Sequence, residues 1–393
     1  MKILVSNIGS TSFKFRLFDM ADGEREIAAG GADRIGGEGG SLQLVIDGHS
    51  SSRQRDFANH GQCIQFVLDQ LVAGGALASP SDLDAVAFKA VMGGDCQPVM
   101  FVDEKLLQRM EYFVPVAPAH NPPYIAAMRM FAKVLPDTPL VAAFEPGFHQ
   151  TMPPRRRYYA VPPNWADRYG IKRYGFHGAS HRYIATRLAE LMPQAGRVIS
   201  CHLGGSSSLC AIRDGQSIAT SMGLSPQSGL PQCNRAGDLD PYSLKLMAAQ
   251  TGRDLDALLA ELGSGAGLAA LSGTGGDMRD IRNGADSGHE RCALALAVYV
   301  TAIRDYLGAY LVELGGADAI VFTGGIGLNN PALRADVLAG LGFAGVRLDP
   351  AKNNHCTRDD RIDADDSVTA VWVLKTNEEL IVARQAAELL CGT

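Results

Sequence analysis

The carboxylate of Glu145 lies in a sequence setting that is compatible with a role in catalysis. In the stretch FEPGFHQTM it follows Phe144 and precedes a Pro-Gly turn, and His149 comes four residues later. A carboxylate in this setting can act as a general base, ligate a metal ion or be a buried structural group. The rest of the chain has to decide among these three roles.

Most of the polar residues that could do chemistry stand beside glycines or in turns bounded by glycine and proline, as in GFHGASH, NRAGDLDP and GTGGDMRD. The full set is Asn7, Ser10, Ser12, Lys14, Lys89, His120, Glu145, His149, His177, His181, Arg235, Asp238, Asp277, Arg279 and Glu378. Each alone is more often a helix cap or a surface pair, and Asp238 and Asp240 are placed to cap a helix that starts near Pro241. Together they suit phosphoryl transfer, in which fixed cations and donors stabilise the moving phosphoryl group and Mg²⁺ bridges the nucleotide phosphates.

The segments that must position these residues contain an internal repeat. ILVSNIGSTSFKFRLFD near the start and VISCHLGGSSSLCAIRDG from Val198 share one plan: an apolar strand, a polar residue, a Gly/Ser turn and a second strand. The matched positions are Asn7 with His202, Gly9 with Gly204 and Ser12 with Ser207. Such a turn presents backbone N–H groups and hydroxyls that can bind phosphate. One such segment is usually an ordinary hairpin, but its repetition favours phosphate binding.

A third glycine-rich segment follows an apolar run. The residues AIVFTGGIGLNN (319–330) predict a strand that ends in a glycine turn, and PALRADVLAGLG after it predicts a helix. Ligands bind at the carboxyl ends of strands in α/β folds. The strict dinucleotide fingerprint, with its following acidic residue, is absent.

Apolar periodicity predicts a mixed α/β protein. Helices are expected at 61–74, 104–113, 122–134, 181–193, 241–250, 253–262, 290–314 and 376–391, and strands at 2–6, 13–19, 84–88, 139–143, 197–201, 208–212, 319–323 and 370–374. A chain of 393 residues exceeds one ordinary core, so two domains are expected. We place them at 1–150 and 151–375, with 144–178 as the crossing between the halves and the terminal helix, about 376–393, packing on the first domain.

Composition excludes several partners. The chain has 46% hydrophobic residues and a net charge of −6, with no polybasic tail, so nucleic acid is not an expected partner. The only local basic run is Arg155-Arg156-Arg157, which we interpret as a solvated loop. No signal peptide or membrane-spanning run is evident, which predicts a cytoplasmic protein. Eight cysteines without a CxxC pair favour reduced, mostly buried thiols over a zinc site or a disulfide framework.

Six motifs in order identify a family. NIGSTSFKFRLFD resembles the NAGSSSLKYQL-type opening of acetate kinases, and RYGFHGASHRY, CHLGGSSS, GDLDP, GGIGLN and TNEELIVAR are similar to that family's later motifs. The resemblance runs from Lys2 to about Arg384. It implies the fold shared by acetate kinase, sugar kinases, the Hsp70 ATPase and actin: two ribonuclease H-like α/β domains with an ATP cleft between them. It also implies a homodimer and closure of the domains around nucleotide.

The resemblance implies roles for residues at matching positions. The catalytic residues would be Glu145, Arg235 and His177, and the Mg²⁺ ligands Asn7 and Glu378, with Mn²⁺ able to substitute. The substrate would contact Lys89, Val91, Ala119, Phe176 and Pro226. The nucleotide, ATP or ADP, would contact Ser10, Ser12, Lys14, His202, Gly204, Gly205, Ser206, Ser207, Asp277, Met278, Arg279, Gly325, Ile326, Gly327 and Asn329.

Several positions depart from the family pattern. HRVVHGGE becomes FKAVMGGD, so Lys89 replaces the arginine that holds the substrate carboxylate, and Phe88 and Met92 replace two histidines. Lysine offers a point charge instead of a two-pronged fork, so weaker or repositioned carboxylate binding is expected. Ala119 replaces a leucine of the acyl pocket, leaving room for a longer acid unless Met92 and Phe88 refill it. HLGNGSS becomes HLGGSSS, and GIGEN becomes GIGLN.

Glu145 replaces the family's active-site Asp. A short carboxylic acid is already ionised at pH 7 and needs no base, so we assign Glu145 to positioning hydrated Mg²⁺ and phosphate. The sequence therefore predicts an acetate kinase that uses ATP and a small carboxylate. Two alternatives stay open: a kinase for propionate, butyrate or another small acid, and an ATP-binding regulatory protein that has lost the kinase activity.

Overall fold

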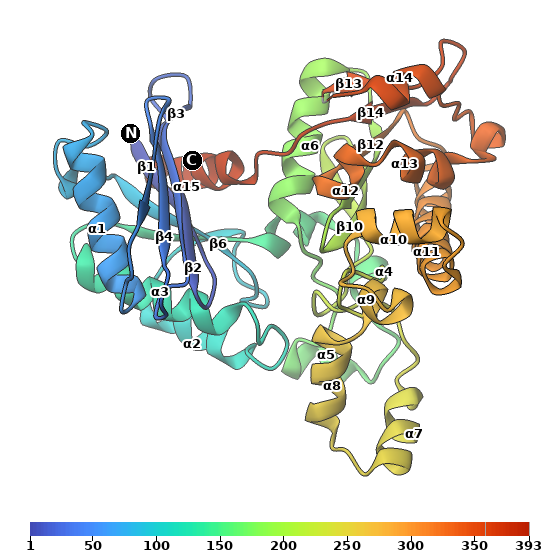
Figure 1. Ribbon diagram of the computed structural model, residues 1–393, viewed down its shortest axis with the longest axis horizontal. Coiled ribbons are helices and arrows are strands. Elements are labelled where there is room, and N and C mark those ends of the chain that lie inside the picture. The colour runs from blue at the N-terminus through green and yellow to red at the C-terminus, as the bar shows by residue number, and fades with distance from the viewer. Residues whose placement is uncertain (358, 393) are drawn as a thin grey trace. The chain divides into compact units, whose positions relative to one another are not determined.

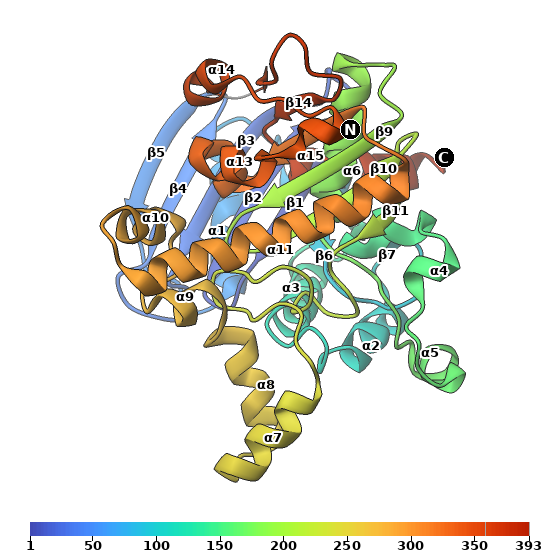
Figure 2. The same ribbon diagram turned by 90° about the vertical axis from the view of Figure 1, so that its right-hand side faces the viewer.

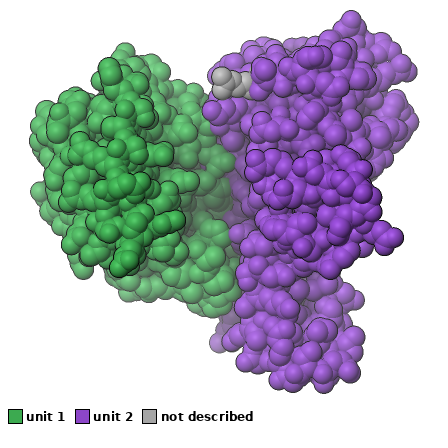
Figure 3. Space-filling model, viewed as in Figure 1, with its two compact units in different colours: residues 1–147, 377–393 green, residues 148–376 purple. Residues whose placement is uncertain are grey.

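The structure is a computed structural model that describes residues 1–357 and 359–392 (Figure 1). The chain divides into two compact units, coloured separately in Figure 3. Unit 1 consists of Met1–Gly147 and Asn377–Thr393, and unit 2 of Phe148–Thr376. Each unit is built on its own mixed sheet, in agreement with the predicted α/β class.

Unit 1 contains an eight-stranded sheet in the order β5-β4-β3-β2-β1-β6-β8-β7. Its strands are β1 (Lys2–Ile8), β2 (Ser12–Asp19), β3 (Arg25–Asp33), β4 (Ser41–Ile46), β5 (His49–Gln54), β6 (Ala85–Ala90), β7 (Val99–Phe101) and β8 (Leu140–Phe144). The helices before the second unit are α1 (His60–Ala73), α2 (Glu104–Tyr112) and α3 (Asn121–Val134). The parallel strands β1, β6 and β8 form the centre, where near-continuous apolar runs are buried on both faces.

The C-terminal helix α15 (Glu378–Cys391) belongs to unit 1. Its residues Val382, Ala383 and Ala386 are buried in one cluster with Ile3 and Val5 of β1. Asn377 caps the helix by accepting a hydrogen bond from the backbone N–H of Leu380. Glu378 lies in the first turn of α15. The packing of α15 therefore brings this residue close to the central strands of unit 1, which begins more than 300 residues earlier in the chain.

Unit 2 contains a six-stranded sheet in the order β11-β10-β9-β12-β14-β13. Its strands are β9 (Arg197–Leu203), β10 (Ser207–Arg213), β11 (Gln216–Thr220), β12 (Ala319–Thr323), β13 (Asp360–Arg361) and β14 (Ala370–Val373). Its helices are α4 (Pro154–Arg157), α5 (Pro163–Tyr169), α6 (Gly178–Leu191), α7 (Tyr242–Thr251), α8 (Leu255–Ser264), α9 (Gly267–Ser272), α10 (Met278–Asp286), α11 (Glu290–Leu314), α12 (Gly324–Asn329), α13 (Pro331–Leu338) and α14 (Pro350–His355).

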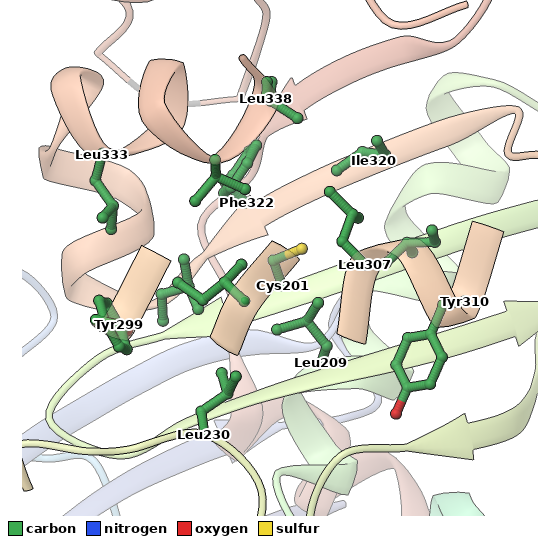
Figure 4. Close-up of a cluster of buried hydrophobic side chains, with 14 of the residues drawn as sticks. Cys201, Leu209, Leu230, Tyr299, Leu307, Tyr310, Ile320, Phe322, Leu333 and Leu338 are labelled. Atoms are coloured by element: carbon green, nitrogen blue, oxygen red, sulfur yellow. The ribbon is translucent and has the colours of Figure 1, made fainter. Parts of the chain in front are cut away.

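The long helix α11 lies along β9 and β10 (Figure 2). Its side chains Tyr299 and Leu307 pack with Leu209, Ile320 and Phe322 of the sheet (Figure 4). By length and composition alone, α11 is the one helix among the described residues that could cross a membrane. In this structure one of its faces forms the core of unit 2.

The predicted internal repeat is confirmed. β1 and β2 form an antiparallel hairpin, as do β9 and β10. In both units the first strand of the hairpin also pairs in parallel with the next central strand, β6 in unit 1 and β12 in unit 2. The two Gly/Ser turns therefore occupy equivalent places in two sheets of the same plan.

The eight helices and eight strands predicted by residue range are all present, with ends shifted by up to three residues. The helix predicted for PALRADVLAGLG is α13, which ends four residues earlier than predicted. The strands β3 to β5 were not predicted; among them β5 reads HSSSRQ and is exposed along its whole length, so it carries no apolar pattern. Two interpretations were wrong. The Gly-Gly-Ile-Gly segment forms the short helix α12 instead of a turn, and Arg155 and Arg156 lie in the helical turn α4, where both form ion pairs with Glu313.

Candidate active site

In unit 1 a partly buried ion pair joins two predicted site residues. Nζ of Lys89, on β6, donates to Oε2 of Glu378 at 2.6 Å. The side chains are only 22% and 14% exposed. Desolvation is the largest single influence and lowers the pKa of Lys89, but the carboxylates of Glu378 and Glu145 together outweigh it and raise that pKa. Lys89 is therefore a fixed cation at neutral pH.

Glu145 stands at the end of β8, at the start of a 3-10 turn over Glu145–Thr151. β8 lies beside β6, with Lys89 opposite Ala143, and the Glu145 carboxylate interacts electrostatically with Lys89. Gly147 packs against Pro98, because a Cβ atom there would lie 2.9 Å from the Pro98 Cβ. The Pro-Gly turn thus fixes a carboxylate that is 5% exposed within the field of the Lys89 cation.

A tyrosine that the sequence did not single out joins the predicted Asn7. The hydroxyl of Tyr124, on α3, donates to Oδ1 of Asn7 at 3.0 Å. Burial raises the pKa of Tyr124 to about 12, so this hydroxyl remains a donor at neutral pH. In the sequence, Tyr124 follows NPP and has the appearance of an ordinary apolar helix residue. No local signal marked it.

The carboxylates of Glu378 and Glu145 and the amide oxygen of Asn7 are of the kinds that bind a magnesium ion. Carboxylate and amide oxygens are the ligands that Mg²⁺ prefers, and it commonly uses one or two protein carboxylates together with waters and substrate phosphates. Within the described residues no group of three His, Cys, Asp or Glu side chains could hold a metal on its own.

The remaining unit 1 positions differ in their accessibility. Ser10 and Lys14 are exposed on the β1–β2 hairpin, and Ser12 is half-buried. Val91 is buried and Ala119 is exposed. Phe88 and Met92, which replace the family's histidines, are fully buried; the Phe88 ring packs edge-on against that of Phe131. The backbone of Met92 is held by the buried amide of Asn121.

In unit 2 a hydrogen-bonded series of histidines and serines surrounds the predicted catalytic His177. This residue precedes α6 in a left-handed conformation, φ 56°, which is uncommon outside glycine. Its Nδ1 is hydrogen-bonded to Oγ of Ser208 at 2.8 Å, and the same hydroxyl bonds Nε2 of His181 at 2.9 Å. The His177 ring stacks on His202 with 4.2 Å between ring centroids. The arrangement fixes the orientation of the His177 imidazole.

His149 and His181 are buried and neutral. Burial lowers the pKa of His149 to about 4 and lowers that of His181 well below its usual range. His149 Nε2 donates to the carbonyl of Phe176 at 2.9 Å, so its Nδ1 must accept from the hydroxyl of Ser217 at 2.8 Å. His149 is therefore a structural residue, and it holds the backbone beside His177.

Arg235 lies on the loop between β11 and α7, which is hydrogen-bonded to the predicted nucleotide segment at Gly205. The neighbouring Cys233 donates its backbone N–H to Gly205, and Gly267 packs closely on the same loop, with φ +67°. Nη1 of Arg235 lies within hydrogen-bond distance of three neutral oxygens, on Ser206, Pro226 and Gln232. Burial lowers the pKa of Arg235. Within the described chain no carboxylate forms an ion pair with it.

Three predicted nucleotide segments meet in one pocket of unit 2, with a volume of about 600 Å³. Its lining residues are Gly204, Gly205, Cys233, Gly275, Gly276, Asp277, Met278, Arg279, Gly325, Ile326, Asn329 and Asn330. Asp277 caps α10 and pairs with the exposed Arg279. Gly324 begins α12 at φ +77°, and a Cβ atom there would lie 2.5 Å from the Leu203 carbonyl oxygen. Glycine is required at that crossing.

The pocket leaves out some predicted contacts. Ser207 is fully buried, and its hydroxyl is hydrogen-bonded to Tyr299 at 2.8 Å inside the core. Gly327 is buried within α12. Asp240 caps α7 as expected, whereas Asp238 accepts from Gly229 and Tyr306 instead. Asp238 and Tyr306 line a second cavity of about 630 Å³, and Asp238 is the only one of the candidate residues among its lining residues.

Comparisons with known proteins agree with this geometry. Residues 2–384 match the model of the acetokinase family. An acetate kinase of Limosilactobacillus fermentum is 37% identical over 393 residues, covering 99% of this chain and 98% of its own. One of Clostridium botulinum is 38% identical over 395 residues, covering 99% of each.

Two solved structures are similar over nearly their whole length. An acetate kinase of Porphyromonas gingivalis superposes with a TM-score of 0.88 at 32% identity, covering 99% of each chain. A propionate kinase of Francisella tularensis subsp. tularensis gives a TM-score of 0.90 at 30% identity, covering 98% of each chain. The predicted fold and the resemblance are confirmed: this chain belongs to the acetokinase family and is a phosphotransferase.

Proposed function

We propose that the chain is an acetate kinase, which transfers the γ-phosphoryl group of ATP to acetate reversibly, giving acetyl phosphate and ADP with Mg²⁺ as cofactor. The observation that carries this proposal is the placement of Arg235. Among the described residues, only neutral oxygens hold its half-buried guanidinium. The same loop lines the 600 Å³ pocket through Cys233. The charge of Arg235 is available to an anion, as the transfer of a phosphoryl group requires.

The substrate carboxylate needs no general base because it is already ionised at neutral pH. Lys89 supplies three N–H donors on a fixed cation, of which one is engaged by Glu378, so it can still hold a carboxylate oxygen. Arg235 and the oriented imidazole of His177 would stabilise charge on the phosphoryl oxygens in flight.

Asn7 and Glu378 would hold Mg²⁺, or Mn²⁺ in its place, with Glu145 positioning its waters. The ion would neutralise charge on the nucleotide phosphates. The pocket lined by Gly204, Gly205 and Gly325 would take the nucleotide, whose phosphates can be bound by backbone N–H groups. EDTA should abolish turnover, and either metal should restore it. Turnover that persists in EDTA would contradict the metal assignment.

A kinase for a longer acid is the second candidate. Ala119 is exposed in the turn before α3, and a structural relative is a propionate kinase. Phe88 and Met92 are buried and present little surface to a ligand. Propionate or butyrate would then be preferred over acetate. An enzyme that uses acetate best and shows no gain with longer acids would exclude this candidate.

The deciding experiment is the rate of acyl phosphate formation, trapped as hydroxamate, with Mg-ATP and acetate, propionate or butyrate. Lys89→Arg is assayed beside the wild type. Turnover with acetate that the variant keeps or improves would support the acetate kinase assignment. Tight ATP binding with no acyl phosphate from any acid would instead favour a regulatory protein that has lost the kinase activity.

Glu145 has its own test. Glu145→Gln keeps the size of the side chain and removes its charge. We expect a lower turnover and a higher Mg²⁺ requirement, because the carboxylate positions the hydrated ion. Unchanged turnover and an unchanged Mg²⁺ requirement would refute this role.

We also infer a cytoplasmic homodimer from family membership, with no nucleic acid or membrane partner. Light scattering after size exclusion should give twice the chain mass of 41.7 kDa. A monomer at assay concentration would contradict the inferred dimer.

A further inference from the structure

The side chain of Gln232 is an unusual feature of the loop that carries Arg235. It is fully buried, and both ends of its amide are hydrogen-bonded. Its Nε2 donates to the carbonyl of Pro226 at 2.8 Å, which fixes which end of the amide is the oxygen. Its Oε1 then accepts from the Ser206 hydroxyl at 2.7 Å and from Nη1 of Arg235 at 3.1 Å.

These bonds hold one end of the Arg235 guanidinium. Nη1 makes all of the side-chain hydrogen bonds that Arg235 forms within the described chain. Besides Gln232, its acceptors are the Pro226 carbonyl oxygen at 3.3 Å and the Ser206 Oγ at 3.4 Å. Nε and Nη2 have no protein acceptor among the described residues. Nε and Nη2 form one of the two-pronged edges through which arginine binds phosphate.

We infer that Gln232 is a positioning residue that holds the Arg235 guanidinium for phosphoryl transfer, with Ser206 fixing the Gln232 amide. A neutral amide suits this task. A carboxylate at position 232 would anchor Nη1 more strongly, but it would also neutralise the charge that the phosphoryl group needs. Gln232 therefore orients the guanidinium without cancelling its charge. This inference rests on the proposed function of Arg235.

Ser206 extends this arrangement to the nucleotide loop. It stands between Gly205, which lines the pocket, and the buried Ser207. Its hydroxyl bonds Gln232 directly, and the backbone N–H of Cys233 bonds Gly205. The loop that lines the nucleotide pocket and the loop that carries Arg235 are thereby joined by both side-chain and backbone bonds.

The test compares Gln232→Met, Gln232→Glu and Ser206→Ala with the wild type. Gln250→Met, on the exposed surface of α7, is the matched control. For Gln232→Met we expect kcat to fall by about 10- to 100-fold, since a misplacement of about 1 Å has that order of effect. KM for ATP and the Kd for ADP should change less than about 2-fold, because ATP and ADP bind the pocket whether or not Arg235 is aligned.

A transition-state mimic separates positioning from general damage. The affinity for ADP with aluminium fluoride and acetate should fall by the same factor as kcat in Gln232→Met, and further in Gln232→Glu, while the affinity for ADP alone is kept. Ser206→Ala should lie between wild type and Gln232→Met. Equal losses for ADP and for the mimic, or wild-type kcat in Gln232→Met, would overturn the inference.

A second readout needs no activity. Phenylglyoxal modifies accessible guanidinium groups, and peptide mass spectrometry gives the rate at Arg235. Releasing Nη1 should raise that rate several-fold in Gln232→Met and leave it unchanged in Gln250→Met. An unchanged rate in Gln232→Met would overturn the inference even if the protein proves inactive. A wild type that phosphorylates none of the acids would instead overturn the proposed function alone.

Discussion

The pair between Lys89 and Glu378 should stabilise unit 1, and its contribution can be worked from the structure. The two atoms lie 2.6 Å apart, and both side chains are less than a quarter exposed. An exposed ion pair contributes at most about 1 kcal/mol, whereas a hydrogen bond to a charged group contributes about 1.5 to 3 kcal/mol. We expect a coupling energy of about 2 kcal/mol in the cycle of Lys89→Met, Glu378→Gln and the double variant.

The two single variants should differ. Lys89→Met removes the cation that acts on two carboxylates, Glu378 and Glu145, and leaves their like charges close together. Glu378→Gln leaves Lys89 still facing Glu145. We therefore expect Lys89→Met to lower the free energy of unfolding by more, about 3 kcal/mol, in the range for breaking a buried pair.

The assay is urea unfolding at pH 7 without nucleotide, followed by far-UV circular dichroism and by tryptophan fluorescence. Both tryptophans, Trp165 and Trp372, lie in unit 2, so fluorescence reports that unit while circular dichroism reports both. The shift should appear by circular dichroism at an unchanged m-value. A coupling energy below about 0.5 kcal/mol, or a larger loss in Glu378→Gln than in Lys89→Met, would refute the reasoning.

Three further outcomes are expected. Burial holds the folded-state pKa of His149 at about 4, below its unfolded value of 6.5, so the contribution of His149 to stability is complete above pH 6.5 and is lost as pH falls toward 4. The urea midpoint should therefore fall less steeply between pH 7 and pH 4.5 in His149→Gln than in the wild type. Equal slopes in the two proteins would contradict this. Ser207→Ala should lower the free energy of unfolding by about 1 to 3 kcal/mol, because it removes the hydrogen-bond partner of the buried Tyr299 hydroxyl. Adding Tyr299→Phe should recover part of that loss. Strictly additive losses in the double variant would count against the hydrogen bond. Gly324→Ala should raise KM for ATP several-fold, because its Cβ would meet the Leu203 carbonyl oxygen at 2.5 Å in a left-handed backbone conformation; an unchanged KM would show that α12 does not contribute to the nucleotide site.

The sequence by itself determined the fold class, the internal repeat and the family. These follow from local patterns: buried strands are read from apolar runs such as LVAAF in β8, helices from their periodicity and caps, and the motifs from consecutive residues. The exposed strand β5 and the short helix α12 lacked such a local signal. The sequence also identified Lys89, Glu378, Arg235 and His177 as candidates, because motif residues can be matched one by one.

Only the tertiary structure decided which side chains meet. Lys89 and Glu378 lie 289 positions apart in the chain and become partners because α15 packs on the sheet of unit 1. Nothing near Gln232 indicates that its amide holds Arg235, and nothing within the Gly/Ser loop indicates that Ser207 faces Tyr299. Such pairings depend on how distant strands, helices and loops pack against one another, and packing is a property of the whole fold that no local pattern encodes.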